Sequence, residues 1–172
     1  VGWGEARRGM RLGSALKRPL VSVIDTVGAA LSKGAEEGGI AWEIARCLSE
    51  LVVLDAPTLC GLLGQGTGGG ALALMPADRV ICAQHSWLSP LPPEGASAIL
   101  YRNIDHAPEL AASQGVRSVD LLRDGIVDRI VAEHPDAADE PAEFVARLSE
   151  VLAPELGVLL RADPADGLAA GW

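Results

Sequence analysis

Short apolar runs alternate with helical segments along this chain, and this alternation is the feature that most constrains its fold. Apolar runs typical of strands lie at residues 20–25, 57–63, 79–83, 87–89 and 126–131. Segments with helical character lie at residues 5–16, 35–54, 71–75, 94–101, 107–113, 118–123 and 142–152. The first run is mostly apolar and β-branched, as expected of a strand buried in a largely parallel sheet. The alternation therefore predicts an α/β fold with crossover connections between strands.

The composition limits both the core and the class of partner. Hydrophobic residues make up 49% of the 172 residues, enough for a packed core, and aromatic residues only 3%, so that core must be aliphatic. The net charge of −9 argues against nucleic-acid binding, which needs a basic surface. No apolar run reaches the roughly 18 residues of a membrane span. Cys47, Cys60 and Cys82 show no C-x-x-C spacing and are expected to be reduced core residues, so the sequence predicts a cytoplasmic protein.

A glycine-rich segment at residues 64–71 is the strongest local signal. It follows a predicted strand and opens a predicted helix, where unpaired N–H groups point toward whatever lies above the helix start. Such a segment can bind phosphate, form an oxyanion hole, or simply make a tight strand-to-helix turn. The nucleotide interpretation fails on context, because Ala71 and Leu72 stand where a P-loop has Lys and no carboxylate follows the next strand, which ends near Gln84.

Two further positions are candidates for a site. Residues 25–29 also follow a buried strand; as an ordinary turn they would use Asp25 to accept local hydrogen bonds. Glu94 opens a helix after two prolines and is interpreted either as a carboxylate that complements the helix dipole or as a general base. The sequence contains no G-x-S-x-G motif, no H-E-x-x-H motif and no Cys/His cluster, so we expect neither a serine nucleophile nor a metal.

Four motifs, in order, resemble the carboxyltransferase alpha subunit of acetyl-CoA carboxylase. The first is IDTVGA at residues 24–29 with GAEE at 34–37 and IAR at 44–46, and the second is GGALA at 69–73 with ADRV at 77–80. The third is PEG at 93–95 with AIL at 98–100, and the fourth is DLL at 120–122 with GIVDRIV at 125–131. Val27 departs from the family, which usually has Pro there, so this loop is expected to differ in shape.

The resemblance implies a crotonase-like fold, a spiral of β-β-α units, present here as an incomplete domain over residues 1–157. The tail at 158–172 does not resemble the family, and its composition rich in Asp, Ala and Gly predicts that it is frayed. The resemblance implies carboxyl transfer from carboxybiotin on a carrier protein to an acyl-CoA; with acetyl-CoA the product is malonyl-CoA, for fatty acid synthesis. The chemistry would rest on backbone amides. The oxyanion hole would be formed by Gly69, Gly70 and Ala71. The substrate and biotin site would be lined by Gly28, Ala29, Gly66 and Gly68.

The resemblance also implies partners, and two alternatives stay open beside it. The partners would be a carboxyltransferase beta-type half, a biotin carboxyl carrier protein and biotin carboxylase, in a homo- or hetero-oligomer. The chain resembles the C-terminal piece of proteins that fuse both halves, so the first strands of the domain are expected outside it. One alternative is a crotonase-type enoyl-CoA hydratase or isomerase that uses Glu94 as its base. The other is a non-catalytic homologue that acts as a scaffold in the carboxylase complex.

Overall fold

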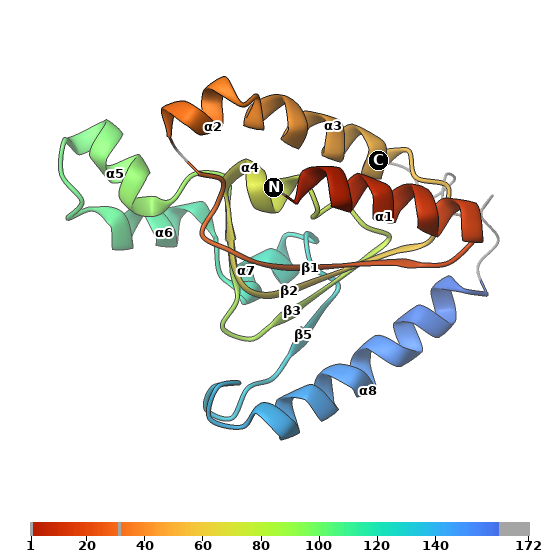
Figure 1. Ribbon diagram of the computed structural model, residues 1–172. Helices are drawn as coiled ribbons and strands as arrows, with labels where there is room; N and C mark the ends of the chain where they lie inside the picture. The colour runs from red at the N-terminus through yellow and green to blue at the C-terminus, as the bar shows by residue number, and fades with distance from the viewer. Residues whose placement is uncertain (1, 31, 162–172) are drawn as a thin grey trace.

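The computed structural model describes residues 2–30 and 32–161 and has the α/β architecture that the alternation predicted (Figure 1). The helices are α1 (Trp3–Leu16), α2 (Lys33–Glu37), α3 (Ile40–Val52), α4 (Gly68–Leu72), α5 (Pro93–Tyr101), α6 (Ala107–Gln114), α7 (Ser118–Arg123) and α8 (Pro141–Leu159). The strands are β1 (Leu20–Thr26), β2 (Thr58–Thr67), β3 (Arg79–Ala83), β4 (Trp87–Ser89) and β5 (Arg129–Val131).

The five strands form one parallel sheet in the order β1-β2-β3-β5, with β4 pairing along the far end of β2. Because all pairs are parallel, the carboxyl ends of the strands meet at one edge of the sheet. Ligands in open α/β sheets gather at this edge. The loops that follow β1, β2 and β3 therefore start on the same side of the molecule.

Side chains of the central strands alternate between two buried faces. Cys60 and Cys82 belong to the cluster on one face, whereas Leu59 and Ile81, one residue away in each strand, pack on the other with Phe144 of α8. This period of two is the geometry of a pleated strand. Since both faces are covered, these strands are apolar throughout, which explains why the sequence shows runs and not alternation.

The helices cover the sheet from both sides. α1 and α3 lie next to each other on one side, where Met10, Cys47 and Leu51 pack together, and α8 runs along the other side beside β5 (Figure 1). The guanidinium of Arg7, which is 8% exposed, donates to the Glu43 carboxylate at 2.5 Å and so joins α1 to α3. α5 and α6 pack on each other and project away from the sheet (Figure 1).

The structure of the glycine-rich segment at residues 64–71 differs from the predicted loop. Residues 64–67 do not form a loop: they extend β2 to Thr67, because Gln65, Gly66 and Thr67 pair with β4. α4 then begins at Gly68, three residues earlier than predicted, at a φ of +64°. Four of the segment's residues are thus a strand, and the turn into the helix is made by one glycine.

One predicted helix and one predicted strand also have different boundaries in the structure. The predicted helix at 35–54 is two helices, because Gly39 has a φ of +73° and separates α2 from α3. The predicted strand at 126–131 shortens to β5, because the N–H of Ile126 donates to the carbonyl of Leu121 and closes the turn after α7.

The C-terminal helix is longer than the range of 142–152 predicted for it. α8 extends to Leu159, which is 8% exposed and packs under the sheet, so the predicted domain boundary at 157 falls within this helix. The part of the predicted frayed tail at 162–172 lies outside the described residues. Within the described residues, none of the helices combines the length and apolarity needed to cross a bilayer.

Candidate functional site

The loop after β1 and the first turn of α4 touch each other through their backbones at the carboxyl edge of the sheet. A Cβ added to Gly70 in α4 would lie 3.2 Å from the amide nitrogen of Ala29 and 3.5 Å from the carbonyl carbon of Gly28. Gly28 has a φ of +106°, and a Cβ there would lie 3.3 Å from the carbonyl oxygen of Thr67. Both glycines lie at a close approach between the end of β1 and the start of α4, and the positive φ of Gly28 also favours glycine there.

An irregularity in the sheet sets this approach. Ile24 pairs with Leu62 but Thr26 pairs with Gly66, so β2 carries two more residues than β1 between these pairs. The carboxylate of Asp25 occupies the extra space: its Oδ1 accepts a hydrogen bond from the N–H of Gln65 at 3.0 Å. A side chain at Gly64 would not fit, because its Cβ would lie 2.3 Å from that same oxygen. Such bulges bend a strand and change the direction of the chain beyond it.

The start of α4 presents backbone donors. The first N–H groups of any helix have no partner inside the helix, and the N-cap residue Thr67 makes no side-chain cap here. Gly70 and Ala71 are buried in this first turn. In the facing loop, the N–H of Gly28 is already engaged by Thr26 Oγ1 at 3.2 Å. The arrangement can stabilise negative charge that develops on a small acceptor oxygen.

A cavity of about 180 Å³ lies where the loop after β1 meets α4. It is lined by Trp3, Val23, Ile24, Asp25, Thr26, Gly28, Ala29, Gly70 and Leu74. Three of the predicted site residues, Gly28, Ala29 and Gly70, are therefore brought together in the lining of this cavity. Two lining residues, Trp3 of α1 and Leu74, which follows the end of α4, were missed, since no sequence motif links them to the glycines.

The other predicted residues lie around this cavity and do not line it. A Cβ on Gly69 would face the Ile44 side chain at 3.5 Å, and Ala71 is fully buried in the core. Gly66 sits tightly between Leu62 and Leu88, where an added Cβ would approach both within 3 Å.

Gly68 makes the turn into α4 near the carbonyl of Pro90, also away from the cavity lining. Glu94 is exposed in the first turn of α5 and is absent from the lining as well. No acid or base other than Asp25 lines the cavity among the described residues.

The cysteines do not supply a nucleophile. Burial raises the pKa of the Cys60 thiol to about 11, and burial also raises the pKa values of Cys47 and Cys82. All three are buried and free. Because only the thiolate is reactive, these residues behave as core side chains, as predicted. In the cavity lining, Trp3, Asp25 and Thr26 carry polar side-chain atoms, and the other polar groups belong to the backbone.

Solved structures share this fold. A Pseudomonas malonate decarboxylase hetero-tetramer in complex with coenzyme A superimposes with a TM-score of 0.74 at 20% identity, covering 98% of this chain and 69% of that chain. The transcarboxylase 12S structure with methylmalonyl-coenzyme A and methylmalonic acid bound gives a TM-score of 0.69 at 21% identity, covering 86% of this chain and 30% of that chain. At these identities the likeness concerns the fold alone, and it confirms the crotonase-like fold class.

Relatives found by sequence have higher identity to this chain than these solved structures do. A probable biotin-dependent acyl-coenzyme A carboxylase beta3 subunit of Mycobacterium tuberculosis (strain ATCC 25618 / H37Rv) is 61% identical over 165 residues, which cover 96% of this chain and 33% of the relative. The acetyl-coenzyme A carboxylase carboxyl transferase subunit alpha of Pelodictyon phaeoclathratiforme (strain DSM 5477 / BU-1) is 39% identical, over 95% of this chain and 49% of the relative. The chain thus spans about a third of the first relative and about half of the second. Residues 1–170 match the family described as acetyl co-enzyme A carboxylase carboxyltransferase-like, and the chain belongs to that family.

Proposed function

We propose that this chain is the alpha-type part of the carboxyltransferase of a biotin-dependent acyl-CoA carboxylase. It would act in moving a carboxyl group from carboxybiotin to the α-carbon of an acyl-CoA such as acetyl-CoA, which yields malonyl-CoA. The observation that carries the proposal is the contact of Gly70 with the Gly28–Ala29 backbone beside a small cavity. A transfer reaction that needs oxyanion stabilisation and no side-chain base fits such a site.

Each loop has a distinct task in this proposal. When bound, carboxybiotin supplies the carboxyl group. The amides at Gly69, Gly70 and Ala71 would hold the charge that develops on the ureido oxygen, with Gly70 nearest the cavity. Gly28 and Ala29 would form the opposite wall, and Gly66 and Gly68 would act by letting the backbone pack and turn. Asp25 would keep the two walls in register through its bond to Gln65.

The assembly would include a carboxyltransferase beta-type half, a biotin carboxyl carrier protein and biotin carboxylase, in the cytoplasm, as a step of fatty acid synthesis. The names of the relatives support this, since they describe subunits of biotin-dependent and acetyl-coenzyme A carboxylases. The thioester would be held mostly by the beta-type half.

The test is a transfer assay. The chain is combined with a beta-type half and a carboxylated biotin carrier, and carboxylation of acetyl-CoA and propionyl-CoA is measured with and without the beta-type half. We expect turnover only in the complete mixture. Turnover of an enoyl-CoA by the chain alone would establish the hydratase or isomerase alternative. A folded complex without any transfer would favour the scaffold alternative.

A further inference from the structure

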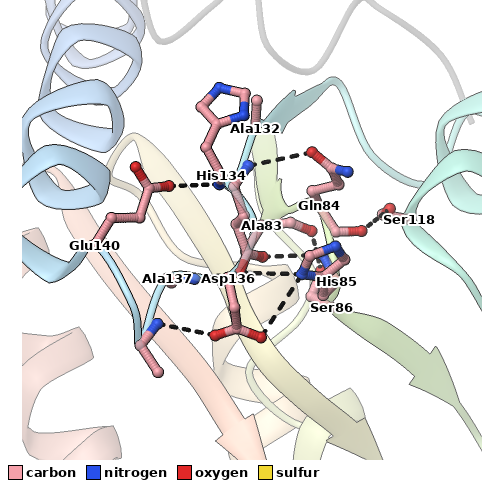
Figure 2. A network of polar contacts seen from close by, with 12 residues as sticks. Ala83, Gln84, His85, Ser86, Ser118, Ala132, His134, Asp136, Ala137 and Glu140 are labelled. Atoms are coloured by element: carbon pink, nitrogen blue, oxygen red, sulfur yellow. Dashed lines mark hydrogen bonds and ion pairs between the residues drawn. The ribbon is translucent and has the colours of Figure 1, made fainter.

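A second group of polar side chains gathers at the ends of β3 and β5, and it shares no residue with the cavity described above (Figure 2). His85 follows β3, and Glu133 and Asp136 follow β5. The Nδ1 atom of His85 lies 3.3 Å from Glu133 Oε2 and 3.9 Å from Asp136 Oδ2. One ligand atom from each of the three side chains falls within 4.8 Å of the other two.

Backbone groups hold both carboxylates in this arrangement. Glu133 Oε1 accepts from the N–H of His85 at 2.9 Å, and Oε2 accepts from the N–H of Ala137 at 2.8 Å. Asp136 Oδ1 accepts from the N–H of Ala138 at 2.8 Å, which leaves Oδ2 turned toward the imidazole. Oriented carboxylates of this kind are the usual outer support of metal ligands.

The segment that carries the carboxylates is itself anchored to the loop after β3. The N–H of Glu133 donates to Gln84 Oε1 at 3.1 Å, and Ser118 Oγ donates to the carbonyl of Gln84 at 2.5 Å (Figure 2). The N–H of Gln84 in turn donates to the carbonyl of Val131 at 2.9 Å. Hydrogen bonds therefore hold the loop after β3 against the segment after β5, which favours a preformed site.

The cluster holds two carboxylates and one imidazole. The Glu133 side chain is 5% exposed, and in the described part of the chain the ion pairs of both carboxylates involve only His85. Two backbone N–H groups already stabilise the Glu133 carboxylate, and a bound cation would add a paired charge that both carboxylates share. Because His85 is 48% exposed and Asp136 is 55% exposed, an ion can enter from solvent.

We propose that His85, Glu133 and Asp136 bind one divalent transition-metal ion, with Zn²⁺ as the best match. Imidazole nitrogen with carboxylate oxygen is a zinc donor set, and bonds of about 2.0–2.2 Å in tetrahedral geometry separate the ligand atoms by roughly 3.4 Å, close to the two His85 distances. The ion would tie the loop after β3 to the segment between β5 and α8. The sequence analysis expected no metal. No linear motif could have indicated this site, because His85 and Glu133 are 48 residues apart.

The test measures zinc affinity directly. The chain is stripped with a chelator and titrated with Zn²⁺ against a chromophoric competitor, and thermal unfolding is recorded with and without the ion. We expect one equivalent to bind and to raise the Tm. His85→Ala and Asp136→Asn should each weaken binding about tenfold or more and remove the Tm increase. Both side chains are largely exposed, and the backbone N–H of His85 and the Asp136 cap of Ala138 survive these changes, so the variants should fold.

Two controls separate this site from other ligands. His106→Ala removes an imidazole that faces a single carboxylate, Glu109 Oε2 at 3.1 Å, and should leave zinc affinity unchanged. Co²⁺ in place of Zn²⁺ should give a spectrum without a thiolate charge-transfer band, because the cysteines do not take part. Equal affinity of His85→Ala and the unchanged chain, failure of Zn²⁺ to bind, or a thiolate band would each overturn the proposal.

Discussion

Gly70 is the central residue of the proposed chemistry. Comparing its two substitutions separates loss of the N–H donor from displacement of the backbone, because proline causes both changes and alanine only the second. Gly70→Pro deletes an N–H near the start of α4, where proline costs a helix little. In the assembled enzyme we expect turnover to fall roughly 10²–10³-fold, the cost of one oxyanion donor. Measured on a protein with an unchanged far-ultraviolet spectrum, near-normal turnover would falsify the oxyanion role.

Gly70→Ala keeps the N–H but adds a Cβ at 3.2 Å from the Ala29 nitrogen, so one loop must move by a few tenths of an ångström. Turnover should fall about tenfold, because catalysis depends on sub-ångström placement. Gly9→Ala is the matched control: in α1 an added Cβ meets nothing within 4 Å, and turnover should stay unchanged. Equal kinetics in both variants would argue that the loop contact is irrelevant.

Glu94 separates the carboxyltransferase from the hydratase-type alternative. It is exposed in the first turn of α5, outside the cavity lining. Glu94→Gln should therefore keep most of the activity and lose only a few tenths of a kcal/mol of helix stabilisation from the dipole. Steady-state kinetics and thermal unfolding together check this. A loss of several orders of magnitude in turnover would instead identify Glu94 as a base.

At the scale of elements, α7 is held by a carboxylate between two guanidinium groups. Asp120 is 6% exposed and accepts from Arg117 Nε at 2.9 Å and from Arg123 Nη1 at 3.1 Å. The hydrogen bond from Arg117 is the main cause that lowers the pKa of Asp120 below its usual 3.8. Because Leu121, the next residue, packs in the core beneath β3, this cluster couples the helix to the sheet.

A lowered folded pKa gives the sign of the pH dependence. The unfolded chain binds a proton on Asp120 more readily, so the stabilisation is complete above pH 3.8 and disappears as the pH falls through the lower folded pKa. Asp120→Asn should lower the free energy of unfolding at neutral pH and flatten its decline in acid. Denaturant unfolding at several pH values measures both. Parallel pH profiles for the two proteins would exclude Asp120 as a contributor.

At the scale of the whole molecule, one sheet face beside the site is left open. Val21 and Val23 point to the same face of β1 and are 43% and 61% exposed, although α8 covers this face further along. The apolar side chains of Ile99, Leu100 and Ile104 are also exposed on the projecting α5–α6 pair. Apolar surface of this kind marks an interaction site. This is consistent with a chain that spans about a third to a half of its relatives.

We therefore expect the 172 residues alone to self-associate and to show negligible transfer, and a beta-type half to restore a defined size and turnover. Light scattering beside the transfer assay measures both quantities. Val23→Lys should reduce self-association, because a charge on an edge strand opposes pairing. Val53→Lys, at the exposed end of α3, is the matched control and should not. A monomer that carboxylates acyl-CoA without a partner would contradict the prediction.

The fold class could be predicted from the sequence, and three of the predicted site residues, Gly28, Ala29 and Gly70, line the cavity. Apolar runs predict buried parallel strands because both faces of the sheet are covered, and this signal is local. The same local logic failed at residues 64–67, where pairing with β4 turned an apparent loop into strand, and at Gly39, where a left-handed φ divided a predicted helix.

Which residues meet depends on the tertiary structure alone. The contact between Gly28 and Gly70, the Asp25 carboxylate under the bulge, and the wall formed by Trp3 all join elements far apart in the chain. The His85–Glu133 pair is of the same kind. The pattern of apolar and polar residues within a segment predicts whether it forms a helix or a strand and which of its faces is buried. The order and register of the strands determine which segments become neighbours, and order and register are set only when the whole sheet forms.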